Sequence, residues 1–71
     1  MVRPQEGMSQ ARVLLSLRAA IDTAIRYPHQ GNVDTALEIA RTYPRALASA
    51  HLRHNLGKRR WDWLAEHGVT P

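Results

Sequence analysis

The sequence predicts an all-α protein, a small compact bundle of about four short helices. Three observations support this prediction. Apolar residues recur at the three- and four-residue spacing of helices, prolines and glycines interrupt the chain between these runs, and Ala is abundant while Phe is absent. The 71 residues suffice for one domain with a small core, which we place at residues 9–71. Pro4 and Gly7 break any regular element in residues 1–8, so we expect a flexible N-terminal arm there.

The clearest predicted helix spans Ser9–Arg26. Ser9 suits the N-cap position, where its hydroxyl accepts a hydrogen bond from an otherwise unpaired backbone N–H. Helical spacing gathers most apolar residues of this segment in one arc. Asp22 lies four residues from both Arg18 and Arg26, which predicts two surface ion pairs. Leu15 falls on the polar side, so it is either an isolated surface leucine or a contact with a partner or a second copy.

Prolines separate this helix from two others. Pro28 ends the first helix, because the residue before a proline is driven out of the α region. Asn32 is the predicted N-cap of the second helix, residues 32–43, and Asp34 in its first turn meets the positive end of the helix dipole. Pro44 fits the first position of a third helix, residues 44–56, because its missing N–H needs no partner there.

The third predicted helix is the least regular. Its apolar residues fall in two stripes, Leu47 with Ala50, and Ala48 with Leu52 and Leu56. Such a helix either lies between neighbours or offers one side to a partner. Gly57 suits a left-handed C-cap that ends it. In the alternative, the helix continues through Gly57, at a cost of about 1 kcal/mol relative to Ala.

A fourth short helix is predicted over residues 59–67. Gly68 and Val69 match a Schellman ending, in which Val69 reaches back to Leu64. Trp61 shares a face with Leu64, whereas Trp63 points roughly opposite. The predicted core consists of Leu14, Leu17, Ile21, Ile25, Val33, Leu37, Ala40, Tyr43, Leu47 and Leu64, with Trp61 partly buried.

Composition excludes several classes of function. The absence of cysteine excludes disulfides, thiolate metal sites and cysteine nucleophiles, and fits a reducing compartment. The sequence contains no motif for catalysis or nucleotide binding, so we expect a protein that is not an enzyme and binds no cofactor. His51 and His54 have a spacing that can chelate a metal, but a stable zinc site needs three or four ligands, so we expect no metal site.

The strongest functional signal is the distribution of charge. The net charge is +4, but residues 39–61 contain six cations and no acid, so this window carries +6 and the remainder −2. A solubilising surface normally interleaves both signs, so the window indicates an anionic partner. Lys58, Arg59 and Arg60 either lie at the negative end of the third helix or contact phosphates beside a tryptophan. The predicted contact residues are Arg41, Arg45, His51, Arg53, His54, Lys58, Arg59, Arg60 and Trp63.

Two stretches resemble known families. Glu38-Ile39-Ala40 followed by Ser49-Ala50-His51-Leu52-Arg53 resembles the helix-turn-helix of small bacterial DNA-binding regulators, although Tyr43-Pro44 stands where that turn usually carries Gly. Val13-Leu14-Leu15-Ser16-Leu17-Arg18 with Arg26-Tyr27-Pro28 resembles the first helix of mitochondrial LYR adaptor proteins, which are basic three-helix modules that dock acyl carrier protein. Only Arg18 matches the namesake triplet of that family. Each resemblance covers a minor part of the chain, and we assign the chain to neither family.

Two functions follow from these observations. The first is a small basic DNA-binding protein, non-enzymatic, helix-turn-helix-like and regulatory in transcription, in which the third helix lies against duplex DNA and Lys58, Arg59 and Arg60 contact phosphates. The second is a helical protein-interaction module, an adaptor or small inhibitor, whose basic face meets an acidic protein surface with Trp63 or Leu15 as the apolar anchor. A small core and a two-sided third helix also allow a homodimer. For either function we expect a cytoplasmic protein with no membrane span.

Overall fold

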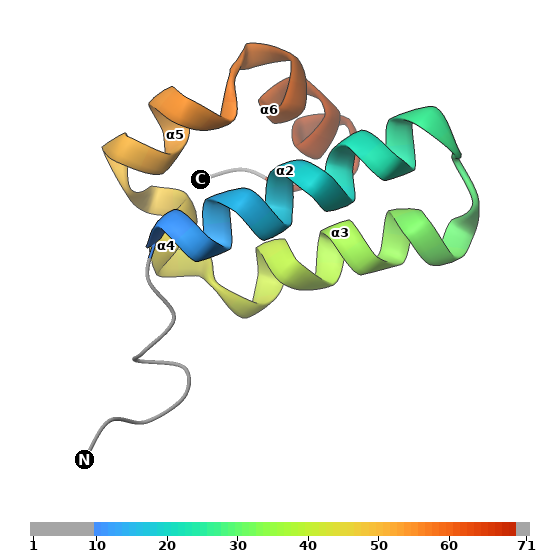
Figure 1. The fold of residues 1–71 in the computed structure, drawn as a ribbon, viewed down its shortest axis with the longest axis horizontal. Coiled ribbons are helices and arrows are strands. Elements are labelled where there is room, and N and C mark those ends of the chain that lie inside the picture. Colours follow the sequence, from blue (N-terminus) through green and yellow to red (C-terminus); the bar gives the residue numbers. More distant parts are fainter. Residues whose placement is uncertain (1–9, 70–71) are drawn as a thin grey trace.

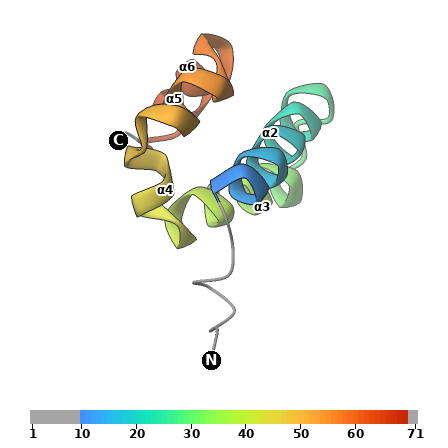
Figure 2. The same ribbon diagram turned by 60° about the vertical axis from the view of Figure 1, so that its left-hand side comes forward.

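The computed structural model describes residues 10–69 and is all-α in that range, as predicted. The helices are α2 (Gln10–Arg26), α3 (Gln30–Thr42), α4 (Pro44–Ala48), α5 (Ala50–Leu56) and α6 (Lys58–Glu66). α2 and α3 run antiparallel and side by side, and α4, α5 and α6 form a second layer against them (Figures 1 and 2). α2 contacts α3, α5 and α6, so it is the central helix. The predicted arm and the Ser9 cap lie outside the described residues.

Small side chains line the contact between α2 and α3. Ala24 of α2 and Ala36 and Ala40 of α3 are all buried, at 0–1% exposure, and small buried side chains allow packed helix axes to approach closely. The predicted N-cap at Asn32 is wrong, because α3 already begins at Gln30. The Asn32 side-chain amide instead donates to the carbonyl of Tyr27 at 2.8 Å. The same carbonyl also accepts from the N–H of His29 at 2.7 Å, so Asn32 adds a second hydrogen bond just after α2 and caps no N–H at the start of α3.

The predicted third helix is divided at Ser49. Ser49 has an extended backbone (φ −68°, ψ 131°), and its hydroxyl accepts a hydrogen bond from the N–H of Leu52 at 3.5 Å, so it caps α5. The break changes the helical phase between the two halves. Leu47 of α4 now faces the same core as Leu52 and Leu56 of α5. The alternative in which one stripe faces a partner is therefore wrong, and only Ala48 of that stripe is exposed.

Glycines mark both ends of α6. Gly57 separates α5 from α6, so the predicted break is confirmed and the continuous helix is not formed. Its φ of +91° is positive as expected, but its ψ of 150° lies outside the left-handed helical region that was predicted. At the other end, the N–H of Val69 donates to the carbonyl of Leu64 at 2.9 Å, and that of Gly68 to Ala65 at 3.0 Å. These two bonds confirm the Schellman ending.

The core fills the space between the two layers. The largest fully buried side chains are Leu17, Ile21, Leu52, Leu56, Leu64 and Val13. Among the predicted core residues, Ile25, Val33 and Tyr43 are half-buried and pack at its edge. Within residues 10–69, no helix has the length and apolar character needed to cross a membrane.

Candidate anion-binding surface

The six cations of residues 39–61 are distributed over four helices. Arg41 lies in the last turn of α3, Arg45 in α4, Arg53 in α5, and the remaining three in the first turn of α6. Arg60 is half-buried, and the other five are exposed. Arg45 lines a pocket beside Tyr43 that is separate from the pockets of α6. The fold therefore divides the basic window into local groups with different surroundings.

Arg60 is engaged within the protein. Its Nε and Nη2 both donate to the carboxylate of Asp22 on α2, each at 2.9 Å, and its Nη1 donates to the carbonyl of Leu56 at 2.9 Å. One guanidinium thus ties α6 to α2 and satisfies a carbonyl at the end of α5. The hydrogen bond from Arg60 is the main cause of the lowered pKa of Asp22. The same bond raises the pKa of Arg60.

This pairing differs from the one that helical spacing predicted for Asp22. Its ion-pair partner is Arg60, 38 residues away, rather than Arg18 or Arg26 on the same helix. Arg18 and Arg59 act on Asp22 through space, and their positive charges help to lower its pKa. Asp22 therefore sits among several guanidinium groups and binds one of them directly.

Lys58 has a weaker internal partner. Its Nζ lies 2.9 Å from Oδ2 of Asp62, one turn further along α6, and this contact raises the pKa of Lys58. Both side chains are well exposed, so the pair contributes little to stability. Lys58, Arg59 and Arg60 together occupy the first turn of α6, where the positive end of the helix dipole disfavours cations. This arrangement costs stability unless an anion lies nearby.

The outer surface of α5 is polar and free of acids. Because Leu52 and Leu56 point into the core, the other side of the helix faces outward. The exposed side chains that carry hydrogen-bonding groups are His51, Arg53, His54 and Asn55, and we name them the α5 face. The guanidinium of Arg53 lies 5.8 Å from the ring centroid of Trp61, whose Nε1–H donates to the Arg53 carbonyl at 3.1 Å. Trp61 thus supports Arg53 from the neighbouring helix.

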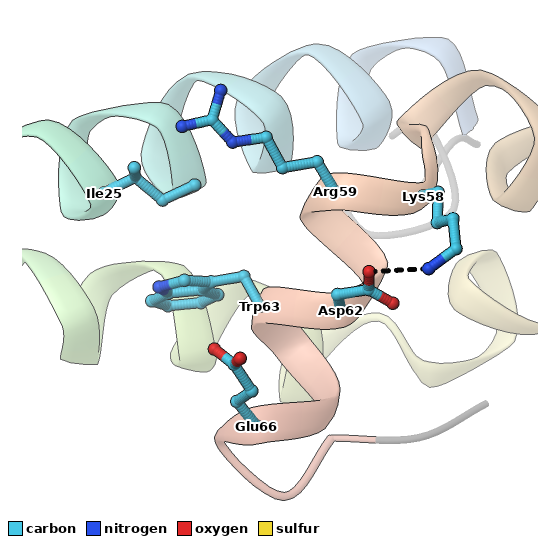
Figure 3. A pocket seen from close by; sticks show the side chains of 6 residues that line it. All are labelled: Ile25, Lys58, Arg59, Asp62, Trp63 and Glu66. Atoms are coloured by element: carbon cyan, nitrogen blue, oxygen red, sulfur yellow. Dashed lines mark hydrogen bonds and ion pairs between the residues drawn. The ribbon is translucent and has the colours of Figure 1, made fainter.

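Trp63 lies on the other side of α6, next to α2. It contributes to a shallow pocket whose lining residues are Ile25, Lys58, Arg59, Asp62, Trp63 and Glu66 (Figure 3). Its indole stacks against the imidazole of His67, with ring centroids 4.1 Å apart. Trp61 and Trp63 are both half-buried, because α6 is covered by α5 on one side and by α2 on the other.

The structure adds one arginine of α2, Arg26, to the candidate site. Arg26 lines a pocket between α2 and α6 together with Asp22, Ile25, Arg59 and Arg60. The basic window begins at residue 39, and helical spacing predicted that Asp22 would pair with Arg26, so no signal in the sequence indicated Arg26 as a site residue. Because the Asp22 carboxylate binds Arg60, neither Arg26 nor Arg59 forms an ion pair with any residue in the described range 10–69.

The segment that resembles a helix-turn-helix folds as α3, α4 and α5. The short helix α4 occupies the place where that motif has only a turn. Among residues 10–69, no group of three or more potential metal ligands is found. Comparison with known proteins finds no matching family model, no matching curated protein and no matching solved structure.

Proposed function

We propose that this protein is a small non-enzymatic DNA-binding module, cytoplasmic and regulatory, that places the α5 face against duplex DNA. The observation that carries the proposal is the chemistry of that face. It offers hydrogen-bond donors and an arginine, and neither α4 nor α5 contains a carboxylate that would repel phosphates. Arginine is also the side chain that most often reads guanine in the major groove. The amide nitrogen of Asn55 already donates to the His51 carbonyl at 2.7 Å, so base readout in this proposal depends on Arg53.

Phosphate contacts supply most of the affinity in this proposal. Lys58 and Arg60 have internal carboxylate partners, which leaves four cations of the basic window for the duplex. These are Arg41, Arg45, Arg53 and Arg59. If these four cations neutralise about four phosphates, they contribute about −4 to the slope of the logarithm of the binding constant against the logarithm of salt concentration. α5 has seven residues and is therefore about 10 Å long, so it contacts few bases.

Binding of a short fluorescent duplex, measured by anisotropy from about 50 to 200 mM salt, tests the proposal. His54→Glu places a negative charge on the α5 face. Ser16→Glu makes the same addition on an exposed position of α2, on the side of that helix opposite Ile25. We expect His54→Glu to weaken binding about tenfold and Ser16→Glu to weaken it much less. An affinity for the duplex that does not change with salt concentration, or equal effects of the two variants on that affinity, would contradict the proposal.

A second candidate is docking to an acidic protein surface. The observation that favours it is apolar exposure near arginines, because Leu15 is 63% exposed and Trp63 lines a pocket with Ile25 and Arg59. In this case Trp63→Ala and Leu15→Ala reduce partner binding more than Arg59→Ala does. If the partner is DNA, Arg59→Ala reduces binding more than Trp63→Ala and Leu15→Ala do. Leu15→Ala should change the folding stability less than Trp63→Ala does, because the exposed Leu15 side chain contributes little to the core.

A further inference from the structure

We propose that Arg26 and Arg59 form a second phosphate-contact site, between α2 and α6, which bound DNA occupies together with the α5 face. This inference rests on the proposed function and adds a contact from α2, outside the basic window. Both arginines line the same pocket, with Asp22, Ile25 and Arg60 beside them. Arg59 extends from α6 toward α2, the helix that carries Arg26 (Figure 3).

The charge balance of this pocket favours an anion. The residues that line this pocket include three arginines, Arg26, Arg59 and Arg60, and one carboxylate, that of Asp22. Arg60 uses both oxygens of Asp22, at 2.9 Å each. The positive charges of Arg26 and Arg59 therefore remain without an ion-pair partner in the described part of the chain. A phosphate group that accepts hydrogen bonds from both guanidinium groups relieves their mutual repulsion.

The Asp22–Arg60 pair holds the two helices of this site, α2 and α6, in fixed positions. It joins α2 to α6 with two parallel hydrogen bonds, and the third bond of Arg60 holds the end of α5. Arg26 lies one turn after Asp22 on α2, and Arg59 directly precedes Arg60 on α6. The backbones that carry the two free arginines are therefore positioned before a ligand arrives, which lowers the entropic cost of binding.

The ligand chemistry is a phosphate group, which has two sources. A phosphodiester of the duplex is the source that we infer, and a free phosphate anion is the other. An acidic protein segment is a different partner. Asp62 and Glu66 of the adjoining pocket, which shares Ile25 and Arg59 with this one, repel an acidic protein and a duplex alike, so the test uses poly-glutamate to separate the two.

The test combines NMR and salt-dependent binding on the full chain. The Nε–Hε signals of Arg26 and Arg59 are followed during addition of a short duplex, of inorganic phosphate and of poly-glutamate. We expect the duplex to shift both signals. We also expect Arg26→Gln to reduce the salt slope of duplex binding by about 1, as the loss of one phosphate contact predicts. Ser16→Glu lowers the net charge by the same amount on the same helix and should leave the slope unchanged.

Four results would overturn the inference. If Arg26→Gln has the same effect as Ser16→Glu while His54→Glu still weakens binding, the second site is removed and the proposed function stands. If inorganic phosphate shifts both signals while Arg26→Gln leaves the duplex slope unchanged, the site binds a free anion. If poly-glutamate shifts both signals and the duplex does not, the partner is an acidic protein. A chain that binds no duplex at all removes the proposed function and this site together.

Discussion

Replacing Asp22 with Asn tests whether the long-range ion pair holds α6 against α2. The pair is bidentate, with both N–O distances at 2.9 Å, and its side chains are 53% exposed for Asp22 and 24% exposed for Arg60. Exposed pairs contribute about 0.2–1 kcal/mol, and bidentate geometry with a half-covered arginine places this one near the upper end. A loss of about 1 kcal/mol lowers the Tm of a domain of this size by about 4–8 °C.

The assay is thermal unfolding, followed by far-UV circular dichroism, in a double-mutant cycle. Asp22→Asn, Arg60→Gln and the double variant are compared with the unmodified chain. The cycle is needed because Arg60→Gln also removes the hydrogen bond to the Leu56 carbonyl. We expect a coupling free energy of about 0.5–1 kcal/mol. A coupling indistinguishable from zero would refute the reasoning that this pair holds the two layers together.

The same pair predicts how stability depends on pH. The pKa of Asp22 is lowered in the folded state, so its contribution is fully present above its ordinary value of 3.8 and is lost as the pH falls through the lower folded value. Asp22→Asn therefore removes part of the acid sensitivity below about pH 4 and destabilises the chain by a constant amount near neutral pH. Unfolding curves at several pH values check this, and an unchanged acid dependence would contradict it.

Three further pairs of substitutions test the local structure by Tm. Gly57→Ala should destabilise the chain by about 1–3 kcal/mol, because the φ of Gly57 is +91°. Gly31→Ala should stabilise α3, because no atom lies near the added methyl group. Equal shifts in Tm for the two variants would contradict this. Ser49→Ala should cost about 1 kcal/mol through loss of the α5 cap, and Ser49→Asp should retain most of it. Leu52→Ala should cost about 2–5 kcal/mol, and Leu15→Ala less than about 0.5 kcal/mol.

Local signals in the sequence predicted most of the helices. Apolar spacing predicted α2, Pro44 marked the start of α4, and Gly57 and Gly68 marked the two ends of α6. These features depend on residues within one or two turns of each other, so the sequence contains all the information they need. The Schellman bonds at Val69 are the clearest case.

The break at Ser49 was missed although its signal was present. Serine is a strong N-cap residue, but Ser49 lies inside a segment that also reads as a continuous helix. Two apolar stripes were obtained for residues 44–56 because the prediction treated two helices as one. One extended residue rotates α5 relative to α4, so that Leu47, Leu52 and Leu56 reach the same core. Two stripes on one predicted helix can therefore indicate a phase change rather than a second interface.

The candidate site depends on contacts that the sequence does not encode locally. Arg60 and Asp22 are far apart in the chain, and nothing near either residue identifies the other as its partner. Helical spacing instead offered Arg18 and Arg26 to Asp22. Only the packing of α6 on α2 shows that Arg60 binds the carboxylate and that Arg26 and Arg59 form no ion pair among residues 10–69.

The most direct test of DNA binding by the α5 face is a map of amide chemical-shift changes when a short duplex is added to the labelled chain. We expect the largest changes on α5, at His51, Arg53 and His54, together with Arg59 at the start of α6. The exposed position Ser16 should not change. Shifts centred on Leu15 and the Trp63 pocket, or no shifts at low salt, would contradict the claim that the acid-free face of α5 binds DNA.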